Sequence, residues 1–132
     1  MKLESKKIAI NAPDEKVFTY ICDLTNFVAL LPDTAIDKKA TAETCSFIMK
    51  RTMTKLSFFI KEKNPNTEVI LASDDTSGFK AQINFHVKAL DAGSEFFMDL
   101  DVDLNPMFAM MAKGPLQIFI DLIAANLKAA VE

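Results

Sequence analysis

Glycine is scarce in this chain. The sequence has three glycines in 132 residues, at positions 78, 93 and 114. Phosphate-binding loops of the GxGxxG and GxxxxGK(S/T) types need glycines a few residues apart, because the backbone must approach the phosphate closely. The GxSxG turn that presents the nucleophile of α/β-hydrolases needs a similar pair. The spacing of the three glycines excludes all of these motifs.

Histidine and cysteine are equally rare, with one His86 and two cysteines, Cys22 and Cys45. A zinc site needs three or four such ligands at short, regular spacing. The cysteines are isolated in a predicted helix and a predicted strand, so we interpret them as reduced, buried thiols. His86 falls on the polar face of a predicted strand, which indicates a solvated or cross-strand-paired ring. We expect no metal site and no cofactor.

The chain has neither a basic excess nor a leader-like start. A net charge of −3 and a pI near 5.2 argue against a nucleic-acid partner, which usually requires a basic face. The first ten residues, MKLESKKIAI, lack the apolar core of a signal peptide. Lys113, Gly114-Pro115 and Asp121 divide the apolar C-terminal run, so no membrane span of about 18 apolar residues is expected. These features predict a cytoplasmic protein.

The remaining composition, 50% hydrophobic and 25% charged, is typical of one globular domain spanning residues 1–132. Residues 3–11 read as a strand, followed by a helix that starts at Pro13-Asp14. Asn26 is a candidate cap for a second short helix that runs to Leu31. The start of the chain therefore predicts one strand and two short helices.

From residue 35 onward the apolar period changes to two, which is typical of half-buried antiparallel strands. Alternation in the last two strands turns one apolar row inward and leaves Asp99, Asp101 and Asp103 outward, where we expect surface charge pairs. Runs of strands followed by a helix indicate the α+β class. The predicted strands are 35–40, 43–53, 55–63, 67–73, 79–88 and 96–104.

The longest apolar-periodic run is the C-terminal stretch 105–132, a predicted helix with Asn105 as its cap. Gly114-Pro115 interrupts the pattern, so we expect a kink or two segments there. One stripe should face a concave sheet, widened by Ile118, Leu122 and Ala125, while Gln117, Asp121 and Lys128 should face water. The stripe consists of Leu116, Phe119, Ile120, Ile123 and Leu127.

Arg51 is the one charged residue that continued alternation turns inward, because it follows Cys45, Phe47 and Met49 at strand spacing. An arginine at the mouth of an apolar cleft would hold a carboxylate or phosphate; the alternative is a solvated turn beyond the strand. Seven methionines and eleven phenylalanines without tryptophan suit either a methionine-lined cavity or a plain packed core.

Three stretches resemble a known superfamily. Residues 5–32, SKKIAINAPDEKVFTYICDLTNFVALLP, resemble the opening strand and two-helix turn of the START/polyketide-cyclase helix-grip superfamily (SRPBCC). The stretches ETCSFIMK and DLDVDLNPMFAMMAKGPLQIFIDLIAANL resemble its small bacterial single-domain members. The resemblance implies a seven-stranded curved antiparallel sheet around a long C-terminal helix, with a hydrophobic cavity between them. Such proteins bind lipids, sterols, quinones, polyketides or plant hormones, and some are cyclases; no catalytic residue transfers by position.

Three functions follow as hypotheses. The first is a carrier or sensor of a small hydrophobic ligand. The second is a cyclase or dehydrase, for which Arg51, Asp33 and Glu62 are the only acid, base or charge candidates. The third is an interaction protein that docks a partner or a second copy through residues 107–111, as a monomer or weak homodimer. The expected cavity-wall residues are Phe27, Met49, Arg51, Phe58, Phe85, Met98, Met111 and Phe119.

Overall fold

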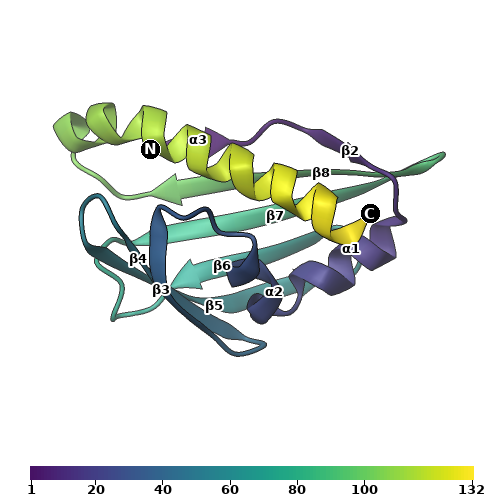
Figure 1. Ribbon diagram of the computed structural model, residues 1–132, viewed down its shortest axis with the longest axis horizontal. Coiled ribbons are helices and arrows are strands. Elements are labelled where there is room, and N and C mark those ends of the chain that lie inside the picture. The colour runs from purple at the N-terminus through teal and green to yellow at the C-terminus, as the bar shows by residue number, and fades with distance from the viewer.

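Six consecutive strands form an antiparallel meander in the middle of the chain. They are β3 (Ala35–Ala40), β4 (Thr44–Met49), β5 (Thr54–Asn64), β6 (Glu68–Ser73), β7 (Ala81–Leu90) and β8 (Gly93–Val102). The structure, a computed structural model, describes residues 1–132. Each strand pairs with its neighbour in sequence, so the sheet runs in order from β3 to β8. Figure 1 shows this curved sheet with the longest helix lying across its concave face.

The predicted first strand, 3–11, is divided into β1 (Lys2–Glu4) and β2 (Ile8–Ile10), which gives eight strands instead of seven. Both pair with β8, and between them the edge holds one more residue than β8 does opposite. This is a β-bulge. The hydroxyl of Ser5 accepts the backbone N–H of Met98 at 2.9 Å, so a side chain satisfies the donor that the bulge leaves free. The alternation of apolar residues along a strand cannot predict that a side-chain hydroxyl takes the place of a backbone acceptor in this way.

Two short helices, α1 (Asp14–Ile21) and α2 (Leu24–Ala29), follow as predicted, but the cap differs. Asp23, not Asn26, caps α2, because its carboxylate accepts a backbone N–H two residues later at 3.0 Å. Asn26 lies inside the helix and donates to the carbonyl oxygen of Tyr20 at 3.0 Å. The buried side chains of the two helices are Val17, Ile21, Leu24 and Phe27.

The C-terminal helix α3 (Pro106–Val131) is one helix of 26 residues, so of the two alternatives at Gly114-Pro115, a kink or two segments, the second is wrong. Asn105 caps it as predicted, accepting the backbone N–H of Phe108 at 2.9 Å. Gly114 and Pro115 are both exposed. Because proline lacks an N–H, the helical hydrogen bond to the carbonyl four residues earlier is missing, yet the helix continues through this point.

Polar and apolar residues on α3 are not distributed as the stripe predicted. Gln117 donates to the carbonyl oxygen of Glu4 at 2.7 Å, and Asp121 accepts the backbone N–H of Lys6 at 2.9 Å. These two residues therefore fasten α3 to the edge of the sheet instead of facing water. Ile118 and Leu122, expected to widen the buried stripe, are exposed. The bulged edge offers free backbone groups, and the helix turns its polar side chains toward them.

By length and composition, α3 meets the criteria for a membrane-crossing helix, with a mean hydropathy of 1.4 in its most apolar window. The predicted interruption at Gly114-Pro115 does not shorten this helix. Its buried side chains nevertheless lie in the protein core, and Gln117 and Asp121 bind the chain's own backbone. These are the contacts of a core helix. The buried α3 side chains are Phe119, Ile120, Ile123, Ala124, Leu127 and Val131.

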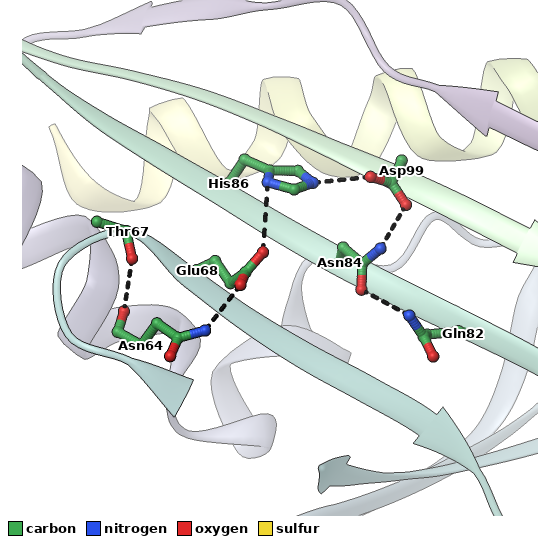
Figure 2. A network of polar contacts seen from close by, with 7 residues as sticks. All are labelled: Asn64, Thr67, Glu68, Gln82, Asn84, His86 and Asp99. Carbon is green, nitrogen blue, oxygen red and sulfur yellow. Dashed lines mark hydrogen bonds and ion pairs between the residues drawn. The ribbon is translucent and has the colours of Figure 1, made fainter. Parts of the chain in front are cut away.

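The outer face of the sheet carries a polar network across β6, β7 and β8 (Figure 2). Asp99 faces outward and pairs across the strands as expected, but it is buried instead of lying at the surface, with only 3% of it exposed. It accepts the side-chain amide of Asn84 at 2.8 Å and lies 2.7 Å from Nε2 of His86. Of the two roles predicted for His86, solvated or paired across strands, the second is found. Its ring also stacks on that of Phe97, with centroids 4.4 Å apart. Glu68 lies 3.8 Å from the other ring nitrogen. Every buried side-chain polar atom of the protein has a partner.

Candidate functional site: an apolar cavity under α3

A cavity of about 220 Å³ lies between the concave face of the sheet and the first two-thirds of α3. A cavity needs on the order of 10–15 Å³ to hold one water molecule, so this space is much larger than a packing defect and the interior is not a plain packed core. Of the 22 lining residues, 18 are hydrophobic. The strand residues are Phe47, Met49, Thr54, Leu56, Phe58, Ala81, Ile83, Met98, Leu100 and Val102; the helix residues are Phe108, Met111, Ala112, Pro115, Leu116, Phe119, Ile120 and Ile123; the loop residues are Arg51, Thr52, Phe79 and Leu104.

Stacked aromatic rings form the inner wall of the cavity. Phe47 projects from β4, with its ring centroid 6.3 Å from that of Phe58 on β5 and 6.2 Å from that of Phe119 on α3. All three side chains are buried or nearly so. Strand alternation turns Phe47 and Phe58 inward, and the helical period brings Phe119 to meet them. This contact fixes the distance between sheet and helix on that side.

The mouth of the cavity is formed by the β4–β5 turn, residues 50–53, and the first turns of α3. Phe79 and Phe108 meet beside it with ring centroids 5.6 Å apart. Met111 lines the cavity and is 73% exposed, so it lies at the boundary between cavity and solvent. Flexible methionine side chains at this boundary can move aside without disturbing the backbone.

Arg51 lies in that turn, beyond the end of β4, and is exposed. The solvated-turn interpretation is therefore correct for its backbone, and the inward-facing strand position is wrong. Arg51 nevertheless lines the cavity, together with Thr52 and Thr54 from the same turn and the start of β5. Because the turn folds over the mouth, a residue outside the strand still reaches the cavity.

The expected wall residues divide into two groups. Six line the cavity: Met49, Arg51, Phe58, Met98, Met111 and Phe119. Phe27 and Phe85 do not. Their rings meet edge to face with centroids 5.4 Å apart, and both side chains are fully buried, so α2 packs directly on the concave face here. Alternation gave both residues the correct inward face, but it carries no information on which end of that face is hollow.

Sequence reasoning missed Phe79, Leu104 and Phe108 as lining residues. For Phe108 a signal was present, because it precedes Phe119 by 11 residues and Ala112 by four, which is the spacing of the stripe itself. Phe79 and Leu104 belong to the inward rows of the predicted strands 79–88 and 96–104, although in the structure both lie just beyond β7 and β8. They were not named as wall residues because alternation gives the face of a strand and not the part of that face that is hollow.

The cavity wall offers few groups for proton transfer. Asp33 and Glu62 are exposed and lie outside it, and no Asp, Glu, His, Lys or Cys is among the lining residues. Cys45 lies on the same inward face of β4 as Phe47 but does not line the cavity, and desolvation raises the pKa of its buried thiol to about 12. The side chains present can enclose an apolar molecule, accept or donate hydrogen bonds through two threonines, and place one positive charge at the mouth.

No family model matches the chain, and no curated protein matches it in sequence. Solved structures do match. A START superfamily protein of Mycobacterium smegmatis has a TM-score of 0.70 at 15% identity, covering 98% of this chain and 96% of that one. The chain has the START-like helix-grip fold.

Two further solved structures match this chain over nearly its whole length. A Thermus thermophilus protein has a TM-score of 0.75 at 14% identity, covering 99% of this chain and 97% of that one. A conserved Geobacillus kaustophilus protein has a TM-score of 0.73 at 9% identity, with 99% and 95% covered. The α+β class, the curved antiparallel sheet and the long C-terminal helix are therefore confirmed. At these identities the likeness concerns the fold alone.

Proposed function

We propose that this protein binds a small hydrophobic molecule in the cavity beneath α3, as a carrier or sensor. The observation that supports the proposal is the cavity itself, about 220 Å³ with 18 hydrophobic residues among its 22 lining residues. Ligand sites in proteins are characteristically concave and apolar with a few polar groups that set orientation. Here those polar groups are Arg51, Thr52 and Thr54.

The energetics of an empty cavity favour the same interpretation. Protein interiors are packed as densely as organic crystals, and apolar side chains that face an unfilled space lose the packing contacts they would otherwise make. Larger side chains at Ala81 or Ala112, both of which line the cavity, would remove that loss. The small side chains at these two positions therefore leave the cavity free for a ligand.

Native mass spectrometry of freshly purified protein tests the proposal directly. We expect a discrete adduct with the mass of a small lipid-like compound, which organic extraction removes. The extracted protein should then melt at a lower temperature, because a ligand that binds only the native state stabilises it by mass action. Re-addition of the extract should restore the original melting temperature.

A matched pair of variants shows whether the cavity is the site. Ala112→Phe places a ring in the cavity from α3, whereas Ala125→Phe places the same ring on the exposed surface of the same helix. Ala112→Phe should abolish the adduct and keep or raise the melting temperature of the extracted protein. Ala125→Phe should retain the adduct. Equal retention by both variants would contradict the proposed site.

The exposed side of α3 supports a second proposal, weak self-association. Apolar side chains follow one stripe of the helix surface, and such patches often mark contact sites. Solution scattering over a concentration series should show an apparent mass that rises with concentration, and Ile118→Glu should suppress that rise. A mass that stays monomeric throughout would refute self-association. The stripe comprises Met107, Met110, Met111, Ile118 and Leu122.

A further inference from the structure

The polar side chains of the cavity all lie at one place. Apart from Pro115, the lining residues that are not hydrophobic are Arg51, Thr52 and Thr54, and these three fall within four consecutive residues. The rest of the wall is apolar. A ligand in this cavity therefore meets a polar environment only at the end of the molecule that faces the β4–β5 turn.

Arg51 is available to a ligand. It is the only arginine in the sequence, and it forms no ion pair and no side-chain hydrogen bond within the protein, whose ion pairs involve Lys39, His86 and Lys128 instead. A guanidinium group has five donors in a rigid plane that matches a carboxylate with two parallel hydrogen bonds. At this mouth those donors have only water or a bound molecule to accept them.

The apolar wall determines where a charge can lie. Placing an ionised group among Phe47, Phe58 and Phe119 would require its desolvation without a partner, which is strongly unfavourable. At the mouth, an anion keeps part of its hydration and gains a charge-assisted bond to Arg51. The cavity volume, about 220 Å³, lies below the roughly 300–1,000 Å³ of sites for drug-sized ligands, so the apolar part must be small.

We propose that the ligand is a small monocarboxylic acid whose apolar body fills the cavity and whose carboxylate pairs with Arg51. This inference rests on the proposed binding function and specifies the ligand class. Thr52 and Thr54 supply hydroxyls beside the guanidinium for the same head group. No acidic residue lines the cavity to compete for Arg51.

Calorimetric titration with a matched pair of probes tests this inference. Octanoate and 1-octanol share an eight-carbon body and differ in charge, and both are used below their aggregation limits at pH 7. Octanoate should bind the wild-type protein about tenfold more tightly than octanol, since a hydrogen bond to a charged group contributes about that factor. Added salt should weaken octanoate binding and leave octanol binding unchanged, because screening acts on the charged pair alone.

Three variants locate the charge. Arg51→Gln should weaken octanoate binding about tenfold and change octanol binding less than twofold, and Arg51→Lys should fall between, because an ammonium group lacks the planar fork. Lys50→Gln removes an equal charge from the adjacent exposed position, which does not line the cavity, and should change neither affinity. All three substitutions lie in an exposed turn, so the variants should fold normally.

The outcomes separate the two proposals. Equal binding of octanoate and octanol, both lost in Ala112→Phe, would overturn the carboxylate inference and leave the binding function standing. An equal loss of octanoate affinity in Lys50→Gln and Arg51→Gln would show general surface attraction, which also overturns the assignment to Arg51. If neither probe bound the wild-type protein and no adduct appeared in native mass spectrometry, both proposals would fail.

Discussion

The concave face of the sheet has a packed end and a hollow end, built from the same strands. On β7, Phe85 and Val87 are buried in the packed end, while Ala81 and Ile83 line the cavity. On this strand the change from cavity lining to packed core takes place between Ile83 and Phe85. Figure 1 shows α1 beside the last turns of α3, with α2 next to α1, whereas the first turns of α3 lie at the opposite end of the sheet.

The difference between the ends lies in what covers them. Residues of α1 and α2 insert into the packed end, where Phe27 meets Phe85, and none of them lines the cavity. At the hollow end, the first turns of α3 cover the sheet with side chains that are themselves largely exposed, such as Met111. The same inward-facing residue types therefore make a core in one place and a cavity in the other.

The sharpest test of this comparison is an alanine substitution at each end. Phe85→Ala should lower the free energy of unfolding by about 3–5 kcal/mol, because a buried ring is lost from a filled region. Met111→Ala should change it by no more than about 0.5 kcal/mol, because the side chain is mostly exposed. Denaturant unfolding of both variants, with unchanged m-values, measures the contrast. Similar losses at the two positions would mean that the hollow end is packed in solution.

A substitution on the outer face of the sheet should have an intermediate effect on stability and none on the cavity of the inner face. His86→Ala removes a partner from the buried carboxylate of Asp99, which retains only the amide of Asn84. We expect a loss of about 1–3 kcal/mol, the usual cost of an unsatisfied buried group. Ligand binding should be unaffected, since the network lies across the sheet from the cavity. Lys88→Ala, on the same face of β7 but exposed, is the control and should be nearly neutral.

The smallest expected effect concerns the point where α3 passes from the hollow end toward the packed one. A Cβ at Gly114 would meet no atom within 4 Å, so Gly114→Ala introduces no clash. Alanine favours the helix by up to about 1 kcal/mol relative to glycine, so the melting temperature should rise slightly. Ligand association and dissociation rates, measured by stopped flow, should fall as this segment stiffens. A large drop in melting temperature would contradict this account.

Much of the architecture followed from periodicity alone. Alternation identified the inward rows of β7 and β8, and the helical stripe identified the buried residues Phe119, Ile123 and Leu127. These signals are reliable because each depends on one element and one apolar face. Asn105 was found for the same reason, since a cap acts on its own helix.

The features that sequence reasoning missed depend on two elements at once. Gln117 and Asp121 face the sheet because the bulge near Ser5 exposes backbone groups to them, and nothing within α3 announces that bulge. Asp99 is buried because its neighbours on β7 satisfy it. The cavity has the same origin, since its emptiness results from how far the covering helices extend along the sheet.

The cavity also makes this protein responsive to hydrostatic pressure. Unfolding eliminates internal voids, so the unfolded state occupies less volume and pressure shifts the equilibrium toward it. The filled region around Phe27 and Phe85 has little volume to lose, whereas the region beneath Met111 and Phe108 has about 220 Å³. Amide and methyl signals from that end should therefore change first as pressure rises. A ligand that fills the cavity would remove this void, so the ligand-bound protein should be less compressible than the free protein.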